Sequence, residues 1–481
     1  MVDNKYDVII VGSGPSGIFT AYELVTHAGS KLKIAIFDKG RDVPERIKER
    51  EKSGGQPSLS IMSGWGGAGA FSDGKITLSS EIGGWLTDLL PRTIVQKLIN
   101  YIDEIWAKFA DKSRIYSYND DKIAELALRA RRAHLRLIPY KIRHLGTDYA
   151  PIALMKAKKF LEELVDIYLE KPVKHLLIHD SKVIGIETEE GEKYYSKYVV
   201  LAPGRFGASW LYKELTRIGV KLSTNPVDIG VRLETTYDTM KELTETIYEP
   251  KLFYYSPTFD DVIRTFCVNP GGYVIAEKYE DVVTTNGHAY ETRRSDNTNF
   301  ALLISSRFTE PFKDPITYGI HIAKLANLLS GGSVLVQRLG DLKRGRRSTR
   351  ERLNRSIVDP TLESAVPGDI SYVLPHRHLV GILEMIEALD KLAPGLNSDH
   401  TLLYVTEVKF YSSRVETTPE LETTSIKNLF TVGDGSGITR SLAQSSASGV
   451  IAARTILRRE KLIKEDDILG DFARKLAMGI Y

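Results

Sequence analysis

Short apolar runs flank a helical pattern near the amino terminus. Residues 7–11 form a run rich in β-branched side chains, which is typical of a strand buried on both faces. Apolar side chains then recur at helical spacing over residues 16–25, and Gly29 is placed to end that helix. Residues 33–37 form a second β-prone run that ends at Asp38. The pattern predicts a strand, a turn, a helix and a second strand.

The turn between the first strand and the helix reads GSGPSG and fits a dinucleotide-binding fingerprint. Gly12 permits the tight turn, Gly14 lets the backbone approach a pyrophosphate, and Gly17 lets the helix pack closely on the strand. Asp38 follows Gly17 by 21 residues and is predicted to accept hydrogen bonds from a ribose. The predicted phosphate-binding residues are Gly12, Ser13, Gly14, Pro15, Ser16 and Gly17.

A second match to the same pattern, GWGGAG at residues 64–69, lacks this context. The sequence after Gly69 has no apolar stripe at helical spacing, and no acid follows at the right distance. We therefore expect no second nucleotide fold here. Four glycines in six residues clear side chains from the backbone, which suits close approach to a ligand; a flexible surface loop is the alternative. The predicted contacts are Gly66, Gly67, Ala68 and Gly69.

Two further stretches carry strand-to-turn signals. Residues 171–207 contain three β-prone runs and end in a strand that meets the turn Ala202-Pro203-Gly204. Residues 428–457 predict a strand, the turn Gly433-Asp434-Gly435 and a helix from about Ser441. Asp434 can accept hydrogen bonds from ribityl or ribose hydroxyls. The positive end of the following helix would favour negative charge on a reduced flavin ring.

These features resemble the large class of FAD enzymes that includes p-hydroxybenzoate hydroxylase and the fumarate reductase flavoprotein. Longer motifs, among them SGWGGAGAFSDGK, RTFCVNPGGYV, PGDISYVLPHR and GDGSG, look like the family of FAD-dependent (NAD(FAD)-utilising) dehydrogenases, over about residues 5–457. The resemblance implies non-covalent FAD and an oxidoreductase activity, without a secure substrate. Many members carry cysteines just before the glycine loop, whereas residues 41–63 contain none. A thiol or iron–sulfur relay is therefore doubtful here.

The implied fold is α/β, with a two-domain FAD-binding Rossmann-type architecture (parallel sheet with helices, and a β-meander) and an α+β substrate domain. Residues 1–80, 150–224 and 420–460 would form a discontinuous FAD-binding domain. Residues 81–149 would form a helical insertion, 225–419 the substrate domain and 461–481 a helical tail. The remaining predicted cofactor residues are Asp38, Lys39, Val173, Ala202, Gly204, Gly433, Asp434, Ile438 and Thr439.

Composition narrows the class of protein. Apolar residues make up 42% and charged residues 26%, and the net charge of +3 argues against a general affinity for nucleic acid or anionic membranes. The single cysteine excludes an internal disulfide and a Cys-x-x-Cys site within one chain. No apolar run approaches the roughly 20 residues that span a bilayer, and no signal peptide is recognisable. We expect a cytoplasmic protein. The scarcity of Cys and Met suits heat adaptation.

Three side chains are candidates for the chemistry, and no metal site is predicted. His288 follows an Asn-Gly turn signal and titrates near neutral pH, so we expect it to manage a proton; a purely structural hydrogen-bonded histidine is the alternative. Arg377 lies in LPHRH and carries over from the family pattern, and in an extended segment His376 and His378 would share the face opposite to it. Arg440 directly precedes the last predicted helix.

The run DLKRGRRSTRERLNRS is strongly basic, with cations at Lys343, Arg344, Arg346, Arg347, Arg350, Arg352 and Arg355. Three interpretations stay open: a solvated helix face, a phosphate or carboxylate site, and nucleic-acid binding. Arginine forks match phosphate and carboxylate. The absence of aromatic residues from the run disfavours nucleic acid.

The sequence thus predicts an FAD-dependent oxidoreductase that transfers a hydride between flavin N5 and a small, anionic organic substrate. The electron partner is unknown, with NAD(P)H open as a transient donor. A flavin monooxygenase, an RNA-modifying flavoenzyme and a non-catalytic binding protein like the Rab escort and GDI proteins are the alternatives. Homo-oligomerisation stays open.

Overall fold

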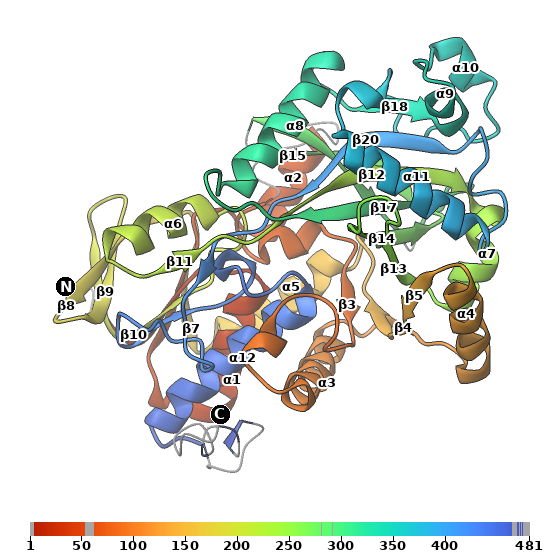
Figure 1. The fold of residues 1–481 in the computed structure, drawn as a ribbon. Helices are drawn as coiled ribbons and strands as arrows, with labels where there is room; N and C mark the ends of the chain where they lie inside the picture. Colours follow the sequence, from red (N-terminus) through yellow and green to blue (C-terminus); the bar gives the residue numbers. More distant parts are fainter. Residues whose placement is uncertain are drawn as a thin grey trace. The chain divides into compact units, whose positions relative to one another are not determined.

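The computed structural model describes residues 4–52, 62–279, 281–290, 292–463, 469, 470, 472 and 474 (Figure 1). Contacts within the chain divide it into two compact units. The first unit comprises Met1–Arg114, Arg143–Asn225 and Tyr411–Tyr481, and the second comprises Ile115–Ile142 and Pro226–Phe410. None of the described helices is long and apolar enough to cross a membrane.

The first unit is built on a seven-stranded sheet in the order β7-β2-β1-β10-β9-β8, with β22 pairing with β10. Its parallel part contains β7, β2, β1, β10 and β22, whereas β8 and β9 run antiparallel. The strands are β1 (Lys5–Val11), β2 (Ile34–Phe37), β7 (Val165–Tyr168), β8 (Val173–His179), β9 (Lys182–Thr188), β10 (Lys193–Leu201) and β22 (Leu429–Thr431). β1 and β2 are almost entirely buried because layers cover both faces of this sheet.

The first unit contains the helices α1 (Pro15–Ala28), α2 (Val43–Lys52), α3 (Arg92–Phe109), α5 (Ala150–Leu161), α6 (Ala208–Arg217) and α12 (Leu442–Arg459). Of these, α1 contacts strands β1 and β2 of this sheet. α1 and α12 lie side by side (Figure 1). A Cβ at Gly449 of α12 would lie only 2.2 Å from the Ser16 carbonyl oxygen, so a glycine is what lets these helices approach so closely.

Shorter elements complete the first unit. The small strands are β3 (Lys75–Thr77), β11 (Leu222–Ser223) and β21 (Arg414–Val415), and the 3₁₀ turns are η1 (Gly29–Lys31), η3 (Gly67–Phe71), η4 (Leu86–Asp88) and η6 (Asp434–Ser436). β4 (Arg114–Tyr116) and β6 (Ile142–His144) each contain a point where the chain passes between units.

The second unit is built on an eight-stranded sheet in the order β19-β18-β20-β12-β17-β14-β13-β5, antiparallel except for β18 and β19. The strands are β5 (Leu135–Ile138), β12 (Val227–Thr236), β13 (Lys251–Tyr255), β14 (Val262–Pro270), β17 (Asn297–Ser306), β18 (Leu335–Arg338), β19 (Val366–Pro367) and β20 (Leu402–Lys409). β15 (Tyr273–Tyr279) and β16 (Val282–His288) form a separate antiparallel pair.

Alternation along β12 separates an apolar from a polar face. Val227, Ile229, Val231 and Leu233 enter the core of the unit, so Asp228, Gly230, Arg232 and Glu234 point to the opposite face. The helices of the unit are α4 (Asp120–Arg132), α7 (Tyr237–Thr246), α8 (Pro315–Leu329), α9 (Leu339–Lys343), α10 (Arg350–Asn354) and α11 (His376–Asp390), with the 3₁₀ turn η5 (Ile370–Tyr372). Apolar residues of α7 and α11 join the core on the apolar face.

The α/β fold class predicted from the sequence is confirmed, including the parallel sheet of the first unit. The predicted insertion 81–149 is divided between the units, since residues 115–142 belong to the second. α12 ends at Arg459, and most of the predicted helical tail 461–481 lies outside the described residues.

Candidate functional site

The first glycine turn has the geometry that the fingerprint demands. A Cβ at Gly12, where φ is 108°, would lie 2.1 Å from the Ala202 carbonyl oxygen, and a Cβ at Gly17 would lie 2.0 Å from that of Gly12. Both glycines are therefore required by close backbone packing. Gly14 differs, because no described atom lies within 4 Å of the position that a Cβ would take there. It is the one glycine of the three that borders open space.

Gly14 also directly precedes helix α1. It takes the N-cap position in an extended conformation, and no side chain caps the helix there. The first N–H groups of a helix have no intrahelical partner and carry partial positive charge. An open approach to such groups fits the pyrophosphate of a dinucleotide.

Asp38, the predicted ribose acceptor, joins three backbone segments. Its Oδ2 accepts hydrogen bonds from the Ser13 N–H at 2.8 Å and the Ser13 hydroxyl at 2.7 Å. Its Oδ1 accepts from the Gly40 N–H at 2.9 Å and the Gly64 N–H at 3.0 Å. A carboxylate has about four acceptor positions. A ribose would therefore share oxygens that already hold the two glycine runs together.

The second glycine run lies directly against the first. The Gly66 N–H donates to the Ser13 carbonyl at 2.8 Å, and a Cβ at Gly67 would lie 3.1 Å from the Gly14 Cα. Gly66 and Gly67 both have positive φ, at 82° and 54°. The run continues into the 3₁₀ turn η3, which contains Ala68 and Gly69, and then into β3. It does not form a second strand–turn–helix unit.

Arg46 of α2 holds the second glycine run from beneath and was not identified from the sequence. Its Nη1 donates to the Trp65 carbonyl at 2.6 Å and its Nη2 to the Gly67 carbonyl at 2.8 Å. The side chain is fully buried, and burial lowers the pKa of its guanidinium to about 10. Arg46 is one of two arginines in the charged segment VPERIKEREK, and no sequence signal separates it from its charged neighbours.

The predicted turns at 202–204 and 433–435 meet at the same helix end. A Cβ at Gly433 would lie 2.4 Å from the Ser16 hydroxyl, and a Cβ at Gly435 would lie 2.8 Å from the Gly204 carbonyl. The carboxylate of Asp434 accepts from the Thr439 hydroxyl at 2.6 Å, and burial raises its pKa. Gly204 has a φ of 63°, with no described atom within 4 Å of its Cβ position.

Two predicted cofactor residues lie in other surroundings. The Lys39 ammonium lies 3.7 Å from the centre of the Phe206 ring, and burial lowers its pKa. Val173 packs in a hydrophobic cluster with Val11 and Phe37. Neither contact tests cofactor binding, so the assignment of Lys39 and Val173 as cofactor residues stays a prediction.

Arg440 is held between two aromatic rings of the first unit. Its guanidinium carbon lies 3.5 Å from the ring centres of both Trp85 and Tyr411. The surrounding backbone is paired, because the Trp85 N–H donates to the Ile438 carbonyl at 2.7 Å and the Arg440 N–H to the Gly83 carbonyl at 2.8 Å. This enclosure fixes a cation two residues before α12.

The polar face of the second unit carries three cations around one aromatic ring, and we call Lys251, Arg264, Lys409 and Phe266 the Phe266 cluster. The cationic groups lie 5.0, 5.1 and 5.7 Å from the ring centre. The three cationic side chains are largely buried, with 4%, 13% and 8% of their surface exposed. Low solvent exposure strengthens their attraction for a negative charge.

A buried polar network adjoins the Phe266 cluster. The fully buried Arg232 forms a bidentate pair with Glu407 at 2.9 and 3.0 Å. Burial alone would raise the pKa of Glu407, but Arg232 and Lys409 hold it at about 2. Arg232 also donates to the Cys267 carbonyl at 3.2 Å. Glu407 is therefore an anion already matched by two cations.

Gly287, the residue before His288, lies next to this network. A Cβ at Gly287 would lie 2.3 Å from Arg232 Nη1, and the half-buried Cys267 has its Sγ 3.9 Å from the Gly287 carbonyl. The His288 ring lies 6.1 Å from that of Tyr290. Tight packing around Gly287 fixes the backbone that carries the histidine.

The LPHRH segment differs from the expectation of an extended strand. Pro375 is the N-cap of α11, which begins at His376, so the face assignment based on an extended segment is wrong. Arg377 forms a bidentate pair with Asp261 at 2.7 and 2.9 Å and is half-exposed. His378 is buried, its Nε2 is 3.1 Å from the Ser306 hydroxyl, and burial lowers its pKa to about 4.

The described residues include no group of three or more His, Cys, Asp or Glu side chains that could hold a metal ion. The glycine turn, by contrast, fits a dinucleotide cofactor such as FAD, because Gly14 opens onto space beside an uncapped helix end.

Comparison with known proteins gives a match to one family and several distant likenesses. Residues 228–409 match the family described as "FAD-dependent protein, C-terminal domain-like". A protein of Clostridium beijerinckii (strain ATCC 51743 / NCIMB 8052), described as "Uncharacterized protein", is 24% identical over 483 residues, which cover 95% of this chain and 81% of that protein.

Solved structures similar to the chain include glycine oxidase from Geobacillus kaustophilus, with 13% identity and a TM-score of 0.41 over 94% of this chain and 95% of that one. L-Proline dehydrogenase from P.horikoshii has 12% identity and a TM-score of 0.44 over 98% of each chain. No conclusion about substrate follows from likenesses this distant.

Proposed function

We propose that this chain, whose residues 228–409 match the family of FAD-dependent proteins, is an FAD-dependent oxidoreductase that transfers a hydride between flavin N5 and a small anionic organic substrate. When bound, FAD supplies the hydride-transfer chemistry. The protein's part is to hold the cofactor, bind the substrate and manage one proton.

We propose that FAD is held by the two glycine runs and by the turns at 202–204 and 433–435. Support comes from the open space at Gly14 and Gly204 and from the packing of Gly67 against Gly14. In this proposal Asp434 binds a hydroxyl of the cofactor, and its contact with Thr439 orients the carboxylate.

The observation that carries the substrate proposal is the Phe266 cluster. Its three cations meet three carboxylates: Asp228 pairs with Arg264, Glu249 with Lys251 at 3.7 Å, and Glu407 with Lys409 at 2.8 Å. Glu407 is shared with the fourth cation, Arg232. These seven side chains therefore carry one net positive charge, which suits a monoanionic group such as a carboxylate.

We propose His288 as the residue that accepts or donates the substrate proton. Support comes from the position of its backbone. The carbonyl of the preceding residue, Gly287, lies 3.9 Å from the Sγ of Cys267, and Cys267 directly follows Phe266 in the chain. Arg377 and Arg440 remain predicted catalytic residues. Substitution of Arg377 would remove its ion pair with Asp261. Substitution of Arg440 would remove its contacts with the rings of Trp85 and Tyr411.

The test is anaerobic reduction of the purified holoprotein by a panel of small carboxylates, amino acids, NADH and NADPH, followed by reoxidation with oxygen, quinones and artificial acceptors. We expect bleaching of the flavin band by an anionic compound. Lys409→Met should raise KM for that compound about 10- to 100-fold, as for loss of one charge-assisted contact.

Lys324→Met serves as the control, because this lysine forms an exposed pair with Asp281 in the same unit. Equal changes in Lys409→Met and Lys324→Met, or a preference for neutral substrates, would exclude the Phe266 cluster as the substrate site. His288→Asn should lower kcat and remove one limb of its pH profile.

A further inference from the structure

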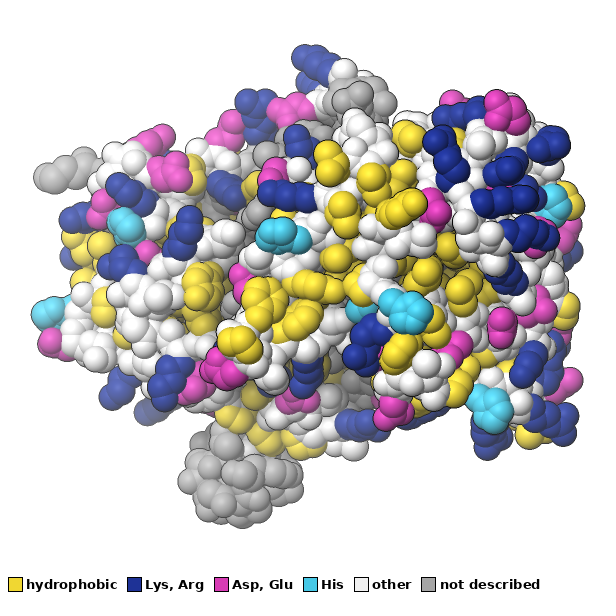
Figure 2. All heavy atoms as spheres, turned by 45° about the horizontal axis from the view of Figure 1, so that its top comes forward, with side chains coloured by type: hydrophobic (Ala, Val, Ile, Leu, Met, Phe, Trp, Pro, Cys, Tyr) yellow, Lys and Arg dark blue, Asp and Glu magenta, His cyan; other side chains and the backbone are white. Residues whose placement is uncertain are grey.

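The basic run of the second unit concentrates cations around a bend of the chain. Between residues 338 and 356 there are seven arginines and one lysine, against the two acids Asp341 and Glu351. The segment contains the end of β18, α9 and α10. Figure 2 shows Lys and Arg side chains gathered over this part of the second unit.

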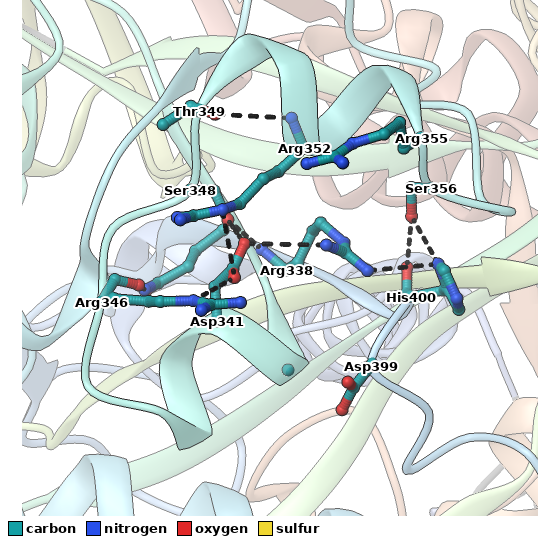
Figure 3. Close-up of polar contacts among 12 residues, drawn as sticks. Arg338, Asp341, Arg346, Ser348, Thr349, Arg352, Arg355, Ser356, Asp399 and His400 are labelled. Atoms are coloured by element: carbon teal, nitrogen blue, oxygen red, sulfur yellow. Dashed lines mark hydrogen bonds and ion pairs between the residues drawn. The ribbon is translucent and has the colours of Figure 1, made fainter.

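Three of these arginines converge on the buried carboxylate of Asp341 (Figure 3). Arg346 Nε donates to Oδ1 at 2.9 Å, while Arg338 Nη1 and Arg352 Nε each lie 3.9 Å from a carboxylate oxygen. The Ser348 hydroxyl donates to Oδ2 at 2.8 Å. Asp341 is only 1% exposed, so one carboxylate organises three guanidinium groups with a net charge of +2.

Arg338 is the least exposed cation of the three. Its side chain is 14% exposed, and its buried Nε has no hydrogen-bond partner among the described residues. Its Nη2 lies 3.3 Å from His400 Nδ1, which already accepts a hydrogen bond from the Ile357 N–H at 3.2 Å. The described contacts therefore give Arg338 a histidine ring nitrogen and a carboxylate at 3.9 Å, without a closer counter-ion.

A neighbouring arginine shows how a solvated pair in this run looks. Arg344 is half-exposed and forms an ion pair of 2.7 Å with Asp399, which raises the pKa of its guanidinium. A merely solvated helix face would consist of such exposed groups. Arg338 and Arg352, with 14% and 29% of their side chains exposed, do not fit that description.

We propose that Arg338, Arg346 and Arg352 form a binding site for a phosphate-bearing small molecule, separate from the Phe266 cluster. The two surplus charges match a phosphate dianion better than a single carboxylate, and guanidinium groups present paired donors to phosphate oxygens. Residues 338–356 contain no aromatic side chain on which a base could stack, which favours a small molecule over single-stranded nucleic acid.

The proposal is tested by calorimetric titration of the purified holoprotein with inorganic phosphate and, separately, with glycerol phosphate, at constant ionic strength set by chloride. We expect saturable binding at one site per chain. Tighter binding of glycerol phosphate would identify an ester as the ligand, whereas equal binding would identify the phosphate group alone.

Arg352→Met and Arg346→Met should each weaken binding at least about tenfold, as for loss of a charge-assisted contact. Arg344→Met, the matched control, should bind as the wild type does. Substitution of the largely buried Arg338 could disturb folding, so the test relies on Arg346, which is half-exposed. Arg346→Met should retain the FAD content and circular dichroism of the wild type.

Three results would overturn the proposal. The first is the absence of saturable phosphate binding. The second is an equal loss of phosphate binding in Arg344→Met, which would indicate a diffuse surface charge. The third is salt-dependent binding of a single-stranded RNA oligonucleotide that phosphate does not displace, which would make the run a nucleic-acid surface.

Discussion

Substitution of the glycines at positions 14 and 17 separates cofactor binding from folding. The Cβ position of Gly14 faces open space, so Gly14→Val should leave the apoprotein within about 1 kcal/mol of wild-type stability, the scale of an N-cap change. The Cβ position of Gly17 lies 2.0 Å from the Gly12 carbonyl oxygen. Gly17→Val must shift this backbone and should lower the free energy of unfolding of the apoprotein by about 3 kcal/mol.

Gly14→Val should have little effect on the stability of the apoprotein but a large effect on FAD binding. A branched side chain there blocks approach of a pyrophosphate to the N–H groups at the start of α1. Two lost charge-assisted hydrogen bonds amount to about 3–6 kcal/mol, so the Kd for FAD should rise more than about 100-fold. Fluorescence titration of the apoprotein with FAD measures the change in Kd. Thermal unfolding in the absence of FAD measures the change in stability.

Gly17→Val should lower the Tm of the apoprotein by about 3–5 °C, whereas Gly14→Val should leave it nearly unchanged. Wild-type FAD affinity in Gly14→Val would mean that the first glycine turn is not the cofactor site. A wild-type Tm in Gly17→Val would contradict the packing argument.

The remaining predictions concern the second glycine run, Asp38, the flavin linkage and the pH dependence of stability. Gly67→Val should reduce both FAD content and turnover, because its Cβ position is 3.1 Å from the Gly14 Cα; normal FAD content with loss of only the response to NAD(P)H would identify a nicotinamide site instead. Asp38→Ala should lower the Tm of the apoprotein as well as FAD affinity, since it removes the acceptor of four hydrogen bonds; an unchanged Tm would favour a purely ribose-binding role. Acid precipitation should release the flavin as FAD, and flavin that stays attached to the protein would disprove non-covalent binding. Burial lowers the pKa of His378 from 6.5 to about 4, so its stabilising contribution is complete above pH 6.5 and is lost as the pH falls toward 4. This shift changes the free energy of unfolding by about 3 kcal/mol in total. His378→Leu should therefore flatten the dependence of Tm on pH over this range, whereas His321→Gln, at an exposed histidine, should not. Parallel curves for His378→Leu and the wild type would contradict this.

Local patterns predicted the first glycine turn well, because each of its requirements is met within a few residues. The strand, the open N-cap at Gly14 and the helix that ends before Gly29 follow from short-range sequence. The bonds between Asp38 and Gly64 and between Arg46 and Gly67 join residues 21 to 26 positions apart, with no periodic signal to reveal them. Such contacts depend on how loops return to the sheet.

The error at LPHRH has a different physical cause. Pro375 was compatible with an extended segment, but proline is also favourable at a helix start, and α11 begins directly after it. The Phe266 cluster was missed because its cations come from three strands, β13, β14 and β20, whose pairing partners are set by the whole sheet. None of the three lies in a charged run, whereas the run at 343–355 was visible at once.

The half-buried Cys267 offers a chemical probe of the second unit. It is the only cysteine among the 481 residues, so an alkylating reagent has a single target in each chain. Its Sγ lies beside the Gly287 carbonyl, and it directly follows Phe266 in the chain. The alkylation rate should therefore fall when a compound occupies the Phe266 cluster, so that binders can be ranked by thiol protection without any turnover.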